Sequence, residues 1–224
     1  MSSAWLAQDP ADLLEHVAGR IADRALAESL AAEVTVTLRK PDVDLPQRVA
    51  HTGVRLHRHR THRYWLGLGA NLGDRAQHMR ELLGHLRDHG VVVEATSPVY
   101  ETAPQLVVDQ PAFLNAAARV RTHLSPPRLL HRIRAAERAV GRVPGPRFGP
   151  RAVDCDVLLW DGGVWDAPEL TVPHPRLRDR RFALIPLLDL DPAPALPDGT
   201  TLAAACAALP EAEQAVVRVA ADLH

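Results

Sequence analysis

The chain has 224 residues, 46% hydrophobic and 24% charged, which is typical of a globular protein with enough apolar material for a sizeable core. The net charge is −1, so no overall field drives binding to nucleic acid or a membrane surface. Cys155 and Cys206 lack the spacing of a zinc site or a redox pair. The N-terminal segment has no signal-peptide pattern and no apolar stretch reaches the ~20 residues of a membrane span, so we expect a cytoplasmic protein.

The first sixty residues predict one helix and two strands. A capping-box pattern at Asp12 and Glu15 precedes apolar residues at helical spacing, which predicts a helix over 12–31. EVTVTLR, from Glu33, and GVRLHR, from Gly53, alternate as strands do, with a proline-broken loop between them. One helix and two strands leave much of an apolar face uncovered, so this segment looks incomplete.

A basic stretch, RLHRHRTHR from Arg55 to Arg63, follows these elements. Its four arginines and three histidines would suit a nucleic-acid patch, but no aromatic side chains are interleaved with them. We therefore expect a solvated strand end and linker, dividing the chain into residues 1–60 and 61–224, and no nucleic-acid partner.

The segment from Tyr64 to Trp160 alternates strands and helices in a recognisable order. YWLGLGAN, VVVEA, FLNAAARVRT and RAVDCDVLLW are typical of strands, and helical patterns end at Gly90 and at Gly141. The order strand, helix, strand, strand, helix, strand predicts an α+β, ferredoxin-like antiparallel sheet with helices on one face.

The last of these strands carries a pair of carboxylates. Side chains alternate along a strand, so Asp154 and Asp156 share one face while Cys155 and Leu159 point to the other, into the core. The two aspartates are about 6.5–7 Å apart along the backbone, which suits a pair of hard cations. Magnesium fits because it prefers oxygen ligands and binds through carboxylates and substrate phosphates.

Arginine-rich loops flank this strand on both sides. GRVPGPRFGPR precedes it and TVPHPRLRDRRF follows it, and cationic loops around a dicarboxylate suit a magnesium-bound triphosphate. Neither a GxxxxGKS/T loop nor GxGxxG is present, which argues against a P-loop or Rossmann site. The irregular loops at 103–111 and 142–150 are predicted lids.

Five ordered blocks between Tyr64 and Pro194 resemble the 6-hydroxymethyl-7,8-dihydropterin pyrophosphokinase family of folate biosynthesis. They are LGLGANLGDR, SPVYETAP, DQPAFLNAA, RFGPRAVDCDVLLW and LTVPHPRLRDRRFALIPLLDLDP. The resemblance implies transfer of pyrophosphate from ATP to the pterin hydroxymethyl group, leaving AMP, with two magnesium ions.

The resemblance also implies roles for individual residues. Asp154 and Asp156 would bridge the metals, and Arg147 and Arg151 would grip phosphates in the reaction. Further nucleotide-side positions are Arg134, Glu137, Thr171, His174 and Arg180. Positions around the pterin are Thr102, Phe113, Asn115, Phe148 and Phe182, whose rings and amide would sandwich a flat heterocycle and bind its polar edge.

The first sixty residues resemble the C-terminal half of dihydroneopterin aldolase. Glu15 matches that family's pterin-anchoring glutamate and Lys40 its catalytic lysine, and Lys40 is the single lysine among 26 basic residues. The first half of the aldolase has no counterpart here, so we expect a truncated, aldolase-like segment. A bifunctional aldolase and pyrophosphokinase completed by oligomerisation is one alternative. A non-catalytic ferredoxin-like binding module is another, although the aromatic pair of such RNA-binding sheets is missing.

Overall fold

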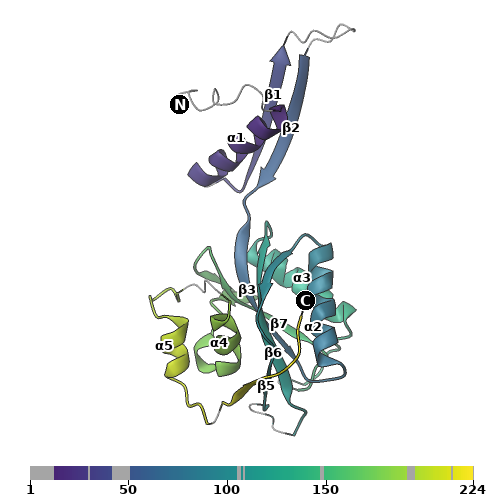
Figure 1. Ribbon diagram of the computed structural model, residues 1–224, viewed down its shortest axis with the longest axis vertical. Coiled ribbons are helices and arrows are strands. Elements are labelled where there is room, and N and C mark those ends of the chain that lie inside the picture. The colour runs from purple at the N-terminus through teal and green to yellow at the C-terminus, as the bar shows by residue number, and fades with distance from the viewer. Residues whose placement is uncertain are drawn as a thin grey trace. The chain divides into compact units, whose positions relative to one another are not determined.

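The computed structural model describes residues 13–29, 31–41, 51–104, 107, 109–146, 149–190, 195–212 and 214–223. The chain forms two compact units, Met1–Arg60, here called the smaller unit, and Thr61–His224, the larger unit (Figure 1). In the described part of the chain, no helix combines the length and the apolar character needed to cross a membrane.

The smaller unit is a helix packed on a two-stranded hairpin. Helix α1 (Leu14–Glu28) contacts strands β1 (Glu33–Pro41) and β2 (His51–His59), which pair antiparallel. Its apolar cluster has Ala18, Ala22 and Val36 as buried members among the described residues. The guanidinium of Arg60 donates to the carbonyl oxygens of Leu26 and Ala31, at 2.5 and 3.1 Å, and so satisfies acceptors near the end of the helix.

Most of the basic stretch from Arg55 to Arg63 belongs to strands and is not a linker. Residues up to His59 belong to β2, and β3 begins at His62, so only Arg60 and Thr61 lie between strands. The prediction of a strand end was correct and that of a linker was wrong over most of this stretch. Alternating arginines and histidines can form a strand where their side chains remain in water, since burial is not needed on both faces.

The larger unit is built on an antiparallel sheet with the order β10-β5-β6-β3-β7, in which β4 also pairs with β6. The expected ferredoxin-like order of two βαβ halves is confirmed in β3, α2, β4, β6, α3 and β7. The elements are β3 (His62–Ala70), α2 (Arg75–Asp88), β4 (Val92–Thr96), β5 (Tyr100–Thr102), β6 (Phe113–Thr122), α3 (Pro126–Ala139), β7 (Asp154–Trp160), β8 (Trp165–Ala167), β9 (Leu170–Val172), α4 (Arg181–Leu188), α5 (Leu202–Ala207) and β10 (Val216–Arg218).

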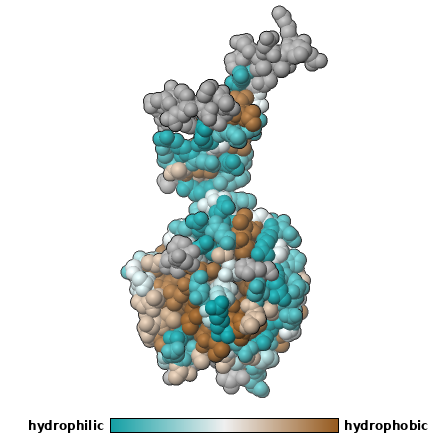
Figure 2. Space-filling view, in the orientation of Figure 1, coloured by the Kyte–Doolittle hydropathy of each residue, from teal (hydrophilic) through white to brown (hydrophobic). Residues whose placement is uncertain are grey.

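Helices cover both faces of this sheet. Along β3, Tyr64 and Leu66 pack in a core cluster with α2 and α3, whereas Trp65 packs in a second cluster with α4 and α5 (Figure 1). The expected helices on one face are α2 and α3, and the second pair adds a layer that the sequence pattern did not predict. Figure 2 shows apolar side chains gathered over the larger unit, while the visible, described surface of the smaller unit is mostly hydrophilic.

A β-bulge interrupts the alternation of β7. The register with β3 shifts between Trp65, opposite Leu159, and Leu66, opposite Val157. Cys155 and Val157 lie in the cluster under α2 and α3, as expected, but Leu158 and Leu159 both lie in the cluster under α4. The expectation that Leu159 shares the face of Cys155 was therefore wrong, because the extra residue of a bulge reverses the faces of the residues after it.

Candidate functional site

Two aspartates and two glycines face each other across neighbouring strands. Asp154 and Asp156 of β7 pair in register with Gly69 and Gly67 of β3. A Cβ at Gly67 would come within 2.9 Å of the Leu158 side chain, so a larger residue there would require Leu158 to move. The alternate glycines thus leave space above β3, and the two carboxylates border a cavity of about 420 Å³.

Asp154 is held by two arginines from the preceding loop. Its oxygens contact the guanidinium groups of Arg142 at 2.6 Å and Arg151 at 2.7 Å. Arg142 also pairs with Glu137, a buried residue of α3 that accepts the backbone N–H of Cys155 at 2.9 Å. Glu137 therefore fixes Arg142 to the start of β7 and sets the position of the Asp154 carboxylate.

Asp156 is less compensated than Asp154. Among the described residues, its nearest cationic partner is Arg180, at 3.8 Å, and the ring of His174 lies at 4.0 Å. Burial, together with the adjacent charge of Asp154, raises the pKa of Asp156 to about 6, although three arginines oppose the shift. Asp154 and Asp156 lie close together, and the arginine contact of Asp156 is longer. A cation bound here would therefore reduce the repulsion between the two carboxylates.

The ring of His174 is oriented with Nε2 toward the carboxylate of Asp156. Its Nδ1 accepts the backbone N–H of Arg176 at 3.1 Å, so the neutral ring carries its proton on Nε2, the atom nearest Asp156. Burial and the charges of Arg180 and Arg176 lower its pKa to about 4. His174 is therefore a neutral hydrogen-bond donor near pH 7.

The other end of the cavity is formed by amide, hydroxyl and aromatic groups. Asn115 of β6 is buried and donates its side-chain N–H to the hydroxyl of Thr102 on β5 at 2.8 Å. Phe113, the register partner of Thr102, also lines this end. Phe182 lines the cavity nearer the carboxylates, with the guanidinium of Arg180 lying 5.5 Å from its ring centre. This end suits a flat heterocycle with polar edges.

Asn71 joins the two loops at the rim of the cavity. Its Oδ1 accepts the backbone N–H of Arg151 at 2.8 Å, and its side-chain N–H donates to Gln110 at 3.0 Å and to the carbonyl of Pro111 at 3.1 Å. Asn71 is buried, so these bonds are shielded from water. Both predicted lid loops are thus anchored on one side chain at the end of β3.

The structure brings together most of the predicted site residues that it describes. The cavity is lined by Arg151, Asp154, Asp156, His174, Arg180, Thr102, Phe113, Asn115 and Phe182. Arg134, exposed on α3, and Thr171, which donates to Asp166 at 3.1 Å, do not line it, and Glu137 lies beneath Arg142. Arg147 and Phe148 lie outside the described residues.

Sequence reasoning missed three contributors to the cavity. Arg142 lies in the arginine-rich loop GRVPGPRFGPR, and its pairing with both Glu137 and Asp154 depends on tertiary contacts that the sequence does not show. Asn71 and Gly67 lie within the LGLGAN block that supported the family resemblance, but their roles were not predicted. The signal was present in the alternate glycines, which are unusual in a central strand and mark a close approach.

The two aldolase-like residues lie in the smaller unit. Glu15 lines a shallow hollow of about 390 Å³ with α1 residues and Arg58, and Lys40 is exposed on β1, opposite Thr52. Lys40 is not among the residues that line this hollow. The structure therefore gives no shared site to Glu15 and Lys40 within the described residues.

The chain resembles known proteins over most of the larger unit. Residues 65–192 match the family model of 7,8-dihydro-6-hydroxymethylpterin-pyrophosphokinase. A 2-amino-4-hydroxy-6-hydroxymethyldihydropteridine pyrophosphokinase of Methylorubrum extorquens is 41% identical over 58% of this chain and 83% of its own length. The Bacillus subtilis protein of the same name is 39% identical over 56% of this chain and 76% of its own length. The family resemblance inferred from the sequence blocks is confirmed.

Longer proteins also match this chain. The mitochondrial folate synthesis bifunctional protein of Pisum sativum is 42% identical over 56% of this chain, which spans only 24% of that relative's length. A solved structure of Plasmodium falciparum HPPK-DHPS has a TM-score of 0.51 at 15% identity, covering 66% of this chain and 44% of that one. At this identity the structural likeness supports the fold alone.

Proposed function

The chain belongs to the 7,8-dihydro-6-hydroxymethylpterin-pyrophosphokinase family, and we propose that its cavity beside β7 carries out the pyrophosphokinase reaction of folate synthesis. In this reaction the hydroxymethyl oxygen of 6-hydroxymethyl-7,8-dihydropterin attacks the β-phosphorus of ATP. The bond from that phosphorus to the oxygen bridging to the α-phosphate breaks, the hydroxyl releases its proton, and AMP leaves. The product is the pterin diphosphate.

The observation that carries this proposal is a single cavity with two chemically different ends. One end has Asp154, Asp156 and the arginines that suit a polyphosphate, and the other, across β3, has Asn115, Thr102 and Phe113. Phe182 lines the cavity beside Arg180. The cavity volume of about 420 Å³ lies in the usual range for a small-molecule site. A phosphate donor and a flat acceptor can therefore lie side by side, with their reacting atoms at the boundary.

Magnesium fits the residues at the phosphate end. The donor set is two carboxylates with no sulfur ligand, and the basic partners described for Asp156 lie 3.8 and 4.0 Å away. Asp154 and Asp156 would hold the two ions, with Arg142 or Arg151 giving way at Asp154. When bound, magnesium supplies charge neutralisation to the transferring phosphates and the leaving AMP.

The protein's own contribution is positioning and charge, without a covalent intermediate. Arg151 and Arg180 line the cavity with forked donors for phosphate oxygens, and neutral His174 presents Nε2–H beside them. Arg147 has the same predicted role. Arg151, Arg180 and His174 line the cavity beside the carboxylates, so each is expected to stabilise the charge of the transition state more than the bound substrate.

Asn115 and Thr102 orient the pterin. Both are buried, and the hydrogen bond from the Asn115 amide N–H to Thr102 fixes the amide, whose carbonyl oxygen would accept from the heterocycle. Phe113 and Phe182 line the same cavity, and Phe148 is predicted to stack on the pterin opposite Phe182. Holding the hydroxymethyl group toward the phosphate in this way removes much of the entropy cost of a two-substrate reaction.

We further propose that the reaction belongs to residues 61–224 and that residues 1–60 form an aldolase-like segment without an aldolase site of its own. Every described residue lining the cavity lies between Gly67 and Ala183, which supports the first part. The separation of Lys40 from the hollow that contains Glu15 supports the second. A cytoplasmic location stays a prediction, and the Pisum sativum relative is named mitochondrial.

Incubating the full chain with ATP, magnesium and 6-hydroxymethyl-7,8-dihydropterin tests the proposal. AMP and the pterin diphosphate should form together in equal amounts and require both substrates. Formation of ADP, or of AMP without pterin, would contradict it. Release of glycolaldehyde from dihydroneopterin by the same preparation would instead support a bifunctional enzyme.

A further inference from the structure

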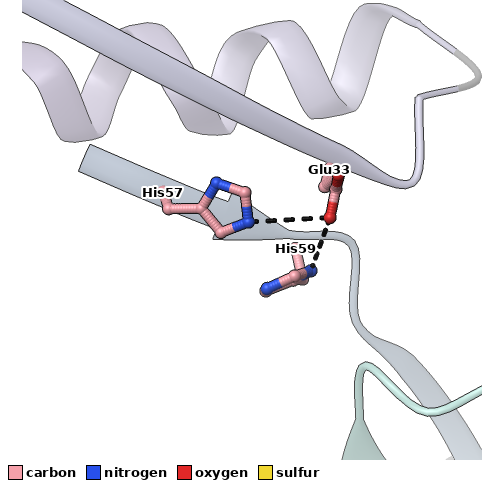
Figure 3. A group of neighbouring side chains, drawn as sticks. All are labelled: Glu33, His57 and His59. Carbon is pink, nitrogen blue, oxygen red and sulfur yellow. Dashed lines mark ion pairs between the residues drawn. The ribbon is translucent and has the colours of Figure 1, made fainter. Parts of the chain in front are cut away.

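Two histidines and a glutamate lie together on the hairpin of the smaller unit, outside the cavity. His57 and His59 are two residues apart on β2 and so point to the same side of the strand, and Glu33 of β1 is the register partner of His59. Figure 3 shows both imidazole rings converging on the Glu33 carboxylate. One ligand atom from each of the three lies within 4.8 Å of the others.

Two of the three spacings between these ligand atoms are close to those of a tetrahedral metal site. Oε2 of Glu33 is 3.6 Å from Nε2 of His57 and 3.5 Å from Nδ1 of His59. Zinc bonds of about 2.0–2.1 Å to nitrogen and oxygen place neighbouring ligand atoms about 3.3–3.4 Å apart in a tetrahedron. To bind a metal ion between the three atoms, the two distances from Glu33 to the histidine nitrogens would therefore need to change only slightly.

A fourth residue orients one of the ligands. Oγ1 of Thr35, the register partner of His57, lies 2.7 Å from Nδ1 of that ring. A proton on Nδ1 donates to the hydroxyl and leaves the lone pair of Nε2 directed at the Glu33 carboxylate. Metal-binding histidines usually have such a partner on the second nitrogen, because it fixes the ring and its tautomer.

From this geometry we propose that Glu33, His57 and His59 bind one zinc ion, which links β1 to β2. Two imidazoles and a carboxylate suit zinc and disfavour magnesium or calcium, which take oxygen ligands. The three side chains are 62%, 48% and 44% exposed, so an ion can enter from solvent and take a water as its fourth ligand. Nothing in this proposal depends on the pyrophosphokinase reaction.

A link of this kind would act where the protein has little apolar core. Among the described residues of the smaller unit, the buried apolar side chains are Ala18, Ala22 and Val36. Small units with so little buried surface are commonly stabilised by a metal or a disulfide. Zinc binding to the folded hairpin would add its binding free energy to the stability of this unit.

Calorimetric titration of zinc into the full chain, in excess magnesium to occupy carboxylate sites, tests the proposal. The wild type should bind one more zinc ion than His57→Gln or His59→Gln, and Thr35→Val should keep the site with about 10- to 100-fold weaker affinity. His16→Gln, an exposed histidine of α1, is the matched control and should bind as the wild type does.

Absorption of bound cobalt(II) provides a second, spectroscopic readout of metal binding. It should give the intense visible absorption of a four-coordinate site in the wild type and in His16→Gln, and zinc should displace it. Loss of that absorption in both histidine variants would support the site. Equal zinc stoichiometry in the wild type and in both histidine variants would overturn it and leave Glu33 as an ordinary ion-pair partner.

Discussion

The two units contain similar elements but differ in how those elements are stabilised. In the larger unit both faces of the sheet are covered, and Tyr64, Leu66, Leu129 and Ile133 are fully enclosed. In the smaller unit one helix covers one face of a hairpin, and the largest buried side chain described there is Val36. Burial of apolar surface supplies most folding free energy, so the larger unit is the stable framework.

The charges differ in the same way. In the larger unit Glu94 is 14% exposed and contacts Arg63, Arg119 and Arg121 at 2.9 to 3.3 Å. In the smaller unit Glu33 is 62% exposed beside two histidines. A shielded carboxylate with three guanidinium partners contributes to stability, whereas an exposed one contributes little unless a metal binds. The carboxylates held by close arginine contacts, Glu94 and Asp154, both belong to the unit whose sheet is covered on two faces.

The largest expected effect comes from removing a carboxylate at the cavity. Asp156→Asn should lower turnover on the order of 10²- to 10³-fold, the loss typical of one group that stabilises transition-state charge. Steady-state AMP formation measures it. Lys40→Met in the smaller unit and Asp198→Asn, an exposed carboxylate outside the cavity, are controls that should retain normal turnover. Equal activity of Asp156→Asn and the wild type would remove the site proposal.

One substitution made in both units compares their cores directly. Val120→Ala removes two methyl groups from a fully buried position in the larger unit and should cost about 2–3 kcal/mol, counting transfer and cavity terms. Val36→Ala, at a site 8% exposed, should cost about 1 kcal/mol, because the thinner packing around it can relax into the space.

Denaturant unfolding followed by intrinsic tryptophan fluorescence and by circular dichroism measures both variants. Two transitions are expected, since each unit has its own core, and each substitution should move only one of them. A single transition shifted equally by both variants would show that the units unfold together.

The element order of the larger unit could be predicted from the sequence because apolar periodicity and Gly or Pro boundaries are local signals. The Asp154 and Asp156 pair was predicted for the same reason, from alternation along one strand. The bulge at Leu158 and the role of Asn71 could not be predicted from the sequence, because each depends on contacts with residues distant in the chain. The second helical layer was missed because α4 contains Pro186 and is apolar on most sides, so it shows little helical periodicity.

A smaller effect on stability is expected from removing the charge of Glu94, a carboxylate shielded by arginines. Hydrogen bonds from Arg63 and Arg121 and the charges around Glu94 outweigh burial and hold its pKa below the ordinary value of 4.5. A lowered pKa in the folded state means that the stabilisation is present above pH 4.5 and is lost as the pH falls through the folded-state pKa.

Glu94→Gln should therefore cost about 1–2 kcal/mol at pH 7, and the difference from wild type should vanish in acid. Unfolding free energies at several pH values measure this. Glu33→Gln, without zinc, is the matched change in the smaller unit and should have little effect at any pH. If the cost of Glu94→Gln did not depend on pH, the arginine contacts would not be the cause.

The smallest effect is expected from removing the smaller unit altogether. A chain of residues 61–224 should keep its turnover number and its affinity for ATP within about twofold, because the described residues lining the cavity all belong to the larger unit. The same chain should show one unfolding transition, matching the larger unit's transition in the full protein, as evidence that it folds. A tenfold loss of turnover in a folded truncated chain would show that residues 1–60 contribute to the site. A loss in substrate affinity alone would assign that contribution to binding, since uniform binding energy changes KM and leaves kcat unaltered.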